Sequence, residues 1–141
     1  MSNIIEELKS EHIEIQKTFN SLYTLSTLKS EEAKKKIEQA KEILINHLVK
    51  EDEKIYPFLY KISRNDTNLK KTLEVFAKDA KEITDKAIKF FDKYLNTKNP
   101  SVLEFTRELG DLYASISRRI FKEENVIYKR FHLENHSIDL D

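Results

Sequence analysis

The sequence contains no cysteine and no tryptophan, and it has only one glycine and two prolines in 141 residues. The absence of cysteine excludes disulfides, thiolate metal ligands and a thiol nucleophile. One glycine cannot form the glycine-rich phosphate loops of nucleotide-binding folds or the many turns of an all-β protein. The 25 Lys and Arg balance the 25 Asp and Glu. This zero net charge argues against binding to nucleic acid or to an anionic membrane.

No segment of the sequence has the composition of a targeting signal or of a membrane-spanning helix. Glu6, Glu7 and Lys9 interrupt the first ten residues, which therefore lack the apolar region of a signal peptide. The longest uncharged run, residues 18–28, is rich in Ser and Thr. It is much shorter than the roughly 20 apolar residues that cross a bilayer. We therefore expect a cytoplasmic protein.

Hydrophobic residues recur every three or four positions in four long stretches, and this periodicity predicts four helices. The predicted helices cover residues 3–27, 30–58, 67–95 and 101–131. Ser30, Asp66 or Thr67, and Ser101 are the expected N-caps, because their side-chain oxygens can accept the first free backbone N–H groups. Pro57 should loosen the end of the second helix.

The four predicted helices form two similar hairpins. The matching segments are residues 5–22 with 73–90 and residues 44–56 with 116–128. Long helices joined by short loops are typical of an up-down-up-down four-helix bundle. We therefore predict an all-α bundle of two pseudo-symmetric hairpins over residues 1–132, followed by a polar C-terminal tail over residues 133–141.

Polar residues interrupt the apolar faces of these helices at one level of the bundle. They are His12, His47, Glu51, Arg119 and Glu123, and the corresponding position on the third helix is Ala80. Counted from the centres of the predicted loops, positions on successive helices match to within about one residue, which is about 1.5 Å. Buried charges are rare unless they are paired or bind a metal. This layer is therefore the candidate functional site.

Short motifs surround these residues. They are Glu11-His12, then His47-x-x-x-Glu51 with Ile55-Tyr56-Pro57, and Glu123-Glu124-x-x-Ile127-Tyr128. Together with the helix order and the internal repeat, they resemble the hemerythrin-like (HHE cation-binding) domains over essentially the whole chain. The resemblance implies a di-iron centre with histidines from all four helices. Carried over by position, it implies His12 and His47 as ligands of one iron, and Glu51 and Glu123 as bridging carboxylates.

The second half of the implied site departs from the family pattern. Ala80 and Arg119 stand where the resemblance implies histidines of the third and fourth helices. We therefore expect no second metal. Since reversible O2 carriage in this family uses two irons, we do not expect a conventional oxygen carrier. O2 or a small redox molecule stays an expected ligand, whereas the sequence identifies no protein partner.

Three interpretations of the layer stay open. In the first, the two histidines and two glutamates bind one Fe or other divalent metal, and the protein senses iron, redox state or oxygen. In the second, no metal binds, and Arg119 neutralises Glu51 and Glu123 in a scaffold or interaction module, with Ala80 leaving space for the guanidinium. The third is a mononuclear iron oxidase or peroxide-handling enzyme. An enzyme is the weaker class, because no nucleophile–base pair is visible.

Neighbouring side chains receive plainer interpretations. Tyr56 and Tyr128 follow the two glutamates at matching positions and are interpreted as core-filling aromatics. Asp52, Glu53 and Glu124 are interpreted as charges on the helix surface.

Overall fold

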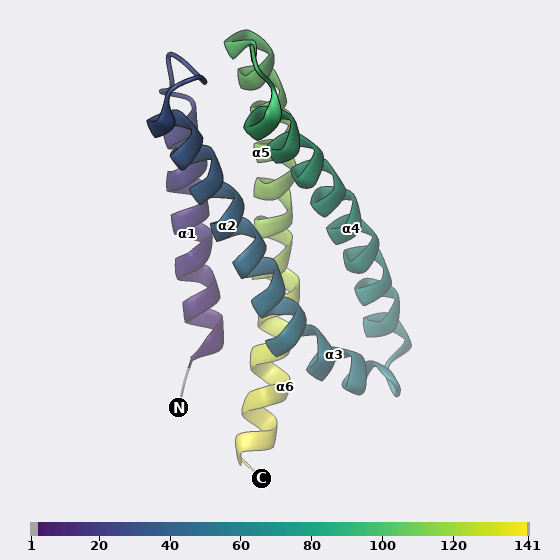
Figure 1. The fold of residues 1–141 in the computed structure, drawn as a ribbon. Helices are drawn as coiled ribbons and strands as arrows, with labels where there is room; N and C mark the ends of the chain where they lie inside the picture. Colours follow the sequence, from purple (N-terminus) through teal and green to yellow (C-terminus); the bar gives the residue numbers. More distant parts are fainter. Residues whose placement is uncertain (1–2, 141) are drawn as a thin grey trace.

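A computed structural model describes the backbone of residues 3–140 and the side chains up to residue 135, so Asp141 of the predicted tail lies outside the described residues. Every regular element in the described part is helical. The elements are α1 Ile4–Leu22, α2 Glu31–Lys54, α3 Tyr56–Ser63, α4 Thr67–Asn96, α5 Val102–Lys122, the π-helix η1 Glu123–Ile127, and α6 Tyr128–Leu140. In Figure 1, α6 continues the line of α5, and both chain ends lie at the same end of the molecule.

The long helices α1, α2, α4 and α5 form the bundle (Figure 1). Helix α1 packs against α2, and α4 packs against α5, as the two predicted hairpins require. Contacts between α2 and α4 and between α1 and α5 join the hairpins. The prediction of an all-α four-helix bundle is confirmed.

The N-caps were also predicted correctly. The side chains of Ser30, Asp66 and Ser101 each accept the backbone N–H three residues later, at 3.1, 3.0 and 3.2 Å. Each bond satisfies one donor that a helix start otherwise leaves free, and such caps contribute about 1 kcal/mol each. Asp66, not Thr67, is the cap of α4.

Helix α1 ends at Leu22, so the prediction that it continues to residue 27 was wrong. The hydroxyls of Ser21 and Thr24 each donate to a backbone carbonyl three residues earlier, both at 2.6 Å. Side chains of this kind compete with the helical hydrogen bonds. The N–H of Tyr23 bonds to the carbonyl of Asn20 at 3.2 Å, which tightens the final turn. The chain then continues as a loop up to Ser30.

The second and fourth predicted helices are interrupted at matching places. Helix α2 ends at Lys54, not residue 58, and Pro57 lies in the first turn of α3, where its missing N–H costs little. The fourth helix changes to a π-helix at Glu123, where the N–H of Tyr128 bonds to the carbonyl of Glu123 five residues earlier. Single π turns inside α-helices are frequent at functional sites.

The buried side chains form two apolar clusters with a polar layer between them. One cluster lies between the polar layer and the α1–α2 and α4–α5 loops, and on α1 it begins at Ile15. The other cluster lies toward the chain ends and includes Leu8. Along α2 the order is the same: Leu44 belongs to the first cluster, the polar residues follow, and Ile55, directly after the helix, belongs to the second cluster. The buried charged or imidazole side chains of this layer are His12, His47, Glu51, Arg119 and Glu123.

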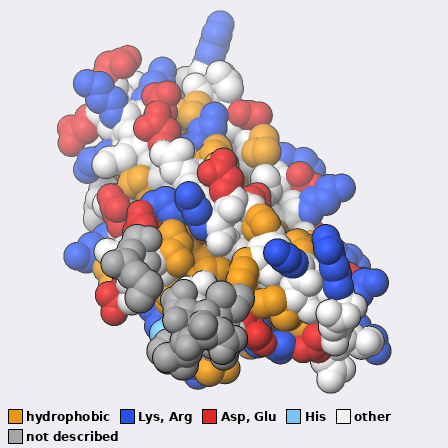
Figure 2. Space-filling view, turned by 90° about the horizontal axis from the view of Figure 1, so that it is seen from below, with side chains coloured by type: hydrophobic (Ala, Val, Ile, Leu, Met, Phe, Trp, Pro, Cys, Tyr) orange, Lys and Arg blue, Asp and Glu red, His pale blue; other side chains and the backbone are white. Residues whose placement is uncertain are grey.

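The surface carries charges of both signs. Figure 2, seen from the end where both termini lie, shows acidic and basic side chains interspersed. Among the described residues, every helix is too short or too polar to cross a membrane.

Candidate metal centre

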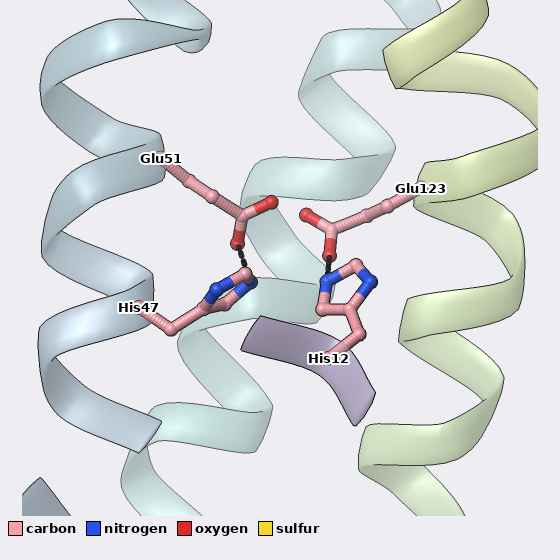
Figure 3. Close-up of side chains that lie close together, drawn as sticks. All are labelled: His12, His47, Glu51 and Glu123. Atoms are coloured by element: carbon pink, nitrogen blue, oxygen red, sulfur yellow. Dashed lines mark ion pairs between the residues drawn. The ribbon is translucent and has the colours of Figure 1, made fainter. Parts of the chain in front are cut away.

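Four side chains from three helical elements meet in the polar layer. His12 comes from α1, His47 and Glu51 come from α2, and Glu123 comes from η1. One nitrogen or oxygen atom of each lies within 4.8 Å of the corresponding atom of every other. All four residues are at most 3 % exposed. Figure 3 shows the two carboxylates directed toward each other above the two imidazoles. The structure thus brings together the four residues that the sequence analysis named.

Two of the four atoms that face the centre lack a hydrogen-bond partner among the described residues. The Nε2 atom of His47 lies 3.2 Å from Oε1 of Glu51, and Nε2 of His12 lies 3.7 Å from Oε1 of Glu123. Neither Nε2 of His47 nor Oε1 of Glu51 has a hydrogen-bond partner among the described residues. Leaving such an atom buried and unpaired costs about 1–3 kcal/mol. Two imidazole nitrogens and two carboxylate oxygens are suitable ligands for a divalent transition metal, so this atom set fits such an ion.

Each histidine is oriented by a carboxylate behind it. The Nδ1 atom of His12 lies 2.7 Å from Oε2 of Glu124, and Nδ1 of His47 lies 2.8 Å from Oε1 of Glu11. Because an ionised carboxylate only accepts hydrogen bonds, the proton is on Nδ1 in both rings. The Nε2 atoms then face the centre, where Nε2 of His12 also lies 3.1 Å from the hydroxyl of Tyr128. Outer carboxylates of this kind fix metal-binding histidines in many proteins.

Glu124 therefore has a role that the sequence analysis missed. The interpretation of this residue as a surface charge was incomplete, because its side chain is 33 % exposed while its carboxylate binds His12. In a regular α-helix, consecutive side chains point about 100° apart. The wider turn of η1 contains both Glu123 and Glu124, and both contact His12 on α1.

Two tyrosines each donate a hydrogen bond to the glutamate of the other hairpin. Tyr128 donates to Oε2 of Glu51 at 2.7 Å, and Tyr56 donates to Oε2 of Glu123 at 3.0 Å. Each tyrosine thus binds the glutamate of the other hairpin and leaves that glutamate's Oε1 facing the histidines. The sequence analysis assigned both rings to the core, and both are buried. The signal for their second role was their matching placement, five residues after each glutamate.

Arg119 fills the second half of the layer. Its Nη1 donates to the carbonyl of Phe76 at 2.5 Å, and its Nη2 donates to the hydroxyl of Tyr56 at 2.7 Å. It forms ion pairs with Asp79 and with Glu123, both at 3.3 Å. The guanidinium also lies over the ring of Phe76, 4.8 Å from its centroid.

This arrangement corrects one detail of the metal-free interpretation. The direct carboxylate partners of Arg119 are Glu123 and Asp79, and Arg119 acts on Glu51 through the electric field alone. Ala80, next to Asp79 on α4, is half-buried and offers no ligand atom. A permanent positive charge therefore occupies the half of the layer where the family resemblance implies a second metal.

The two glutamates have opposite pKa shifts. Burial alone raises the pKa of Glu51, but the interactions with His47, Glu123 and Tyr128 outweigh burial and lower it to about 2. Burial and the neighbouring charge of Glu51 raise the pKa of Glu123 well above its usual value. Because two adjacent carboxylates cannot both ionise easily, Glu123 is the one that retains a proton.

The two histidines also differ. Burial is the largest effect on His12 and lowers its pKa, so this ring is neutral at neutral pH. Burial acts in the same direction on His47, but Glu51 and Glu11 outweigh it and raise the pKa. A metal at this centre would therefore compete with protons held by Glu123 and His47.

A family model described as the hemerythrin HHE cation-binding domain matches residues 3–131. The chain belongs to the hemerythrin family. No curated protein and no solved structure matched the chain. In this hemerythrin domain, the buried group of two histidines and two glutamates could hold a metal ion.

Proposed function

We propose that this hemerythrin domain binds one divalent transition metal, and that the ion is iron, as the family resemblance implies. The ligands are Nε2 of His12 and His47 and Oε1 of Glu51 and Glu123. The observation that carries this proposal is the convergence of these four buried atoms within 4.8 Å, two of which lack a hydrogen-bond partner.

Charge balance supports the choice of a divalent ion. With both imidazoles neutral, the ionised Glu51 and Glu123 supply the two negative charges that balance a divalent cation. Without metal, the raised pKa of Glu123 favours its protonated form, which removes one of these two negative charges. Metal binding would release that proton, so the affinity for metal should increase with pH.

Arg119 supports a limit of one metal. Its guanidinium is 3.3 Å from Oε2 of Glu123, the oxygen that would face a second ion. A cation cannot be placed beside this fixed positive charge without a large electrostatic cost in a site of low polarity. With one metal instead of two, we propose that the domain senses iron, redox state or oxygen and does not carry O2.

Metal analysis of matched variants tests this proposal. Protein purified without a histidine tag is incubated anaerobically with Fe²⁺, and iron per chain is measured after removal of free ion. We expect about one iron in the unmodified protein, and a large loss of iron in His47→Ala, which removes one of only a few ligands. His132→Ala, which changes an exposed histidine outside the layer, is the matched control and should retain the ion. Negligible iron in the unmodified protein would refute the proposal.

A metal-free scaffold is the second candidate, favoured by the ion pair between Arg119 and Glu123 at 3.3 Å. In this case Arg119 alone compensates the buried acid. The melting temperature of the protein as isolated would then be unchanged by a strong chelator and by added Fe²⁺. An increase in melting temperature on addition of Fe²⁺ supports the metal centre instead, because a ligand that binds only the folded state stabilises it.

A further inference from the structure

The metal centre has no open access. Its four ligand residues are at most 3 % exposed, so an incoming ion must pass groups that connect the centre to the surface. The two carboxylates behind the histidines are such groups, because the side chains of Glu11 and Glu124 are 22 % and 33 % exposed.

On the Glu11 side, a fixed ammonium group opposes the entry of a cation. The ammonium group of Lys50 bonds to Glu11 and also to Glu7, the latter at 2.7 Å. This ammonium lies against the carboxylate that orients His47. The positive charge and the ionic bonds that fix it oppose entry beside His47.

The Glu124 side is different, because a hollow there reaches one ligand residue of the centre. A hollow of about 470 Å³ lies between α1 and the α5–η1 segment, and its lining includes His12. Glu124 lines this hollow, and it also lines a second one of about 380 Å³ bounded by α1 and α6. The carboxylate of Glu124 thus faces two open spaces and contacts a ligand of the centre, at 2.7 Å from Nδ1 of His12.

We propose that the hollow between α1 and α5–η1 is the entry port for the divalent cation, and that Glu124 is the surface carboxylate that captures the ion before it reaches His12 and Glu123. This inference rests on the proposed metal centre. The chain geometry supports a short transfer, since Glu124 and Glu123 are neighbours in η1 and both contact His12. Lys9 also lines the hollow and opposes capture by its charge.

The rate of metal uptake tests the port. Fe²⁺ is mixed anaerobically with the metal-free full-length protein, and the free ion is followed over time with a chromogenic chelator, while iron per chain is measured at equilibrium. Glu124→Gln retains an oxygen that can accept from Nδ1 of His12 but removes the charge. We expect its uptake to be slower by roughly tenfold, the lower end of the range expected when local charge steers an ion.

Three further variants separate steering from general damage. Lys9→Gln removes the opposing charge and should accelerate uptake. Ser117→Phe places a ring in the hollow that Ser117 lines, and should slow uptake while the final iron content stays at one per chain. Glu82→Gln removes an exposed acid from a different hollow, between α4 and α5, and should leave the rate unchanged.

The outcomes distinguish this inference from the proposed function. Slower uptake in Glu124→Gln and Ser117→Phe, with Glu82→Gln unchanged, supports the port. Equal rates in all variants, each with one iron at equilibrium, would overturn the port and leave the metal centre intact. No iron in the unmodified protein would overturn both. Circular dichroism identifies any variant that fails to fold. If Ser117→Phe does not fold, Lys9→Gln and Glu124→Gln still test the port, because they change residues near the surface and should change the uptake rate in opposite directions.

Discussion

Replacing Arg119 by methionine should strongly destabilise the metal-free protein. Methionine fills much of the same volume but removes the charge, two hydrogen bonds to Phe76 and Tyr56, and the ion pairs to Asp79 and Glu123. Breaking a buried pair costs about 3–5 kcal/mol when the remaining charge has no partner. Because Glu123 can retain a proton, as its raised pKa shows, we expect the lower end, about 3 kcal/mol.

This loss should be measured by urea unfolding and by thermal melting. For a domain of this size, about 3 kcal/mol corresponds to a decrease of roughly 10 °C in melting temperature. The neighbouring Arg118 provides the matched control, because it is exposed and its hydrogen bond to Ser115 is long, at 3.4 Å. Arg118→Met should change stability by less than about 0.5 kcal/mol. If Arg119→Met costs no more than Arg118→Met, the assigned role of Arg119 is wrong.

The effect of added metal on the stability of Arg119→Met is a second test of the role of Arg119. A divalent ion bound by Oε1 of Glu51 and Glu123 would replace part of the positive charge that Arg119→Met removes. The variant should therefore be stabilised by Fe²⁺ more than the unmodified protein is, as measured by the increase in melting temperature at equal iron concentration. An equal or smaller increase would contradict the view that Arg119 and a metal compensate the same carboxylates.

Three further predictions follow from the contacts in the layer. Glu11→Ala removes the carboxylate behind His47 and should weaken Fe²⁺ binding about 10–100-fold in a competition titration; an unchanged affinity would show that the hydrogen bond is irrelevant to metal binding. Tyr128→Phe removes the donor to the ionised Glu51 and should cost about 1.5–3 kcal/mol in urea unfolding, and a cost near zero would contradict this role. Because the pKa of Glu123 is raised above 4.5 in the folded state, its contribution to stability is present below pH 4.5 and lost as the pH rises through the raised pKa. Glu123→Gln removes this titration, so the stability of the variant relative to the unmodified metal-free protein should increase from pH 4 to pH 8, and no such pH dependence would refute the shift.

The bundle and the four candidate ligands could be predicted from the sequence because helical periodicity and loop length fix them. His47 and Glu51 are four residues apart on a regular helix and must share a face. His12 and Glu123 were placed by counting residues from the loops, and an error of one residue shifts a position by only about 1.5 Å. Burial of all four residues then agrees with their positions on the apolar faces.

The contacts around the ligands could not be predicted in the same way. Counting with 3.6 residues per turn assumes an unbroken helix, and this assumption fails at Ile55 and in η1. The adjacent buried pairs Ile55 and Tyr56, and Ile127 and Tyr128, do not reveal the interruptions, because Phe90 and Phe91 are also adjacent and buried within the regular helix α4.

The ion pair of Arg119 with Asp79 depends on tertiary packing and leaves no periodic signal. Asp79 is half-buried on α4, and its carboxylate meets the guanidinium because α4 and α5 pack against each other. The sequence identified the cation in the layer, but the spacing of residues along one helix cannot show which acid on another helix it contacts.

The crossed tyrosines make the two halves of the molecule dependent on each other. Tyr56 belongs to the first hairpin and binds Glu123 of the second, while Tyr128 belongs to the second and binds Glu51 of the first. A fragment that ended in the connection between α3 and α4 would contain one buried acid without its phenol and one phenol without its acid. Each hairpin produced alone would therefore need a second hairpin to complete its polar layer, and two separately expressed fragments cut at this connection should recover the fold only on association.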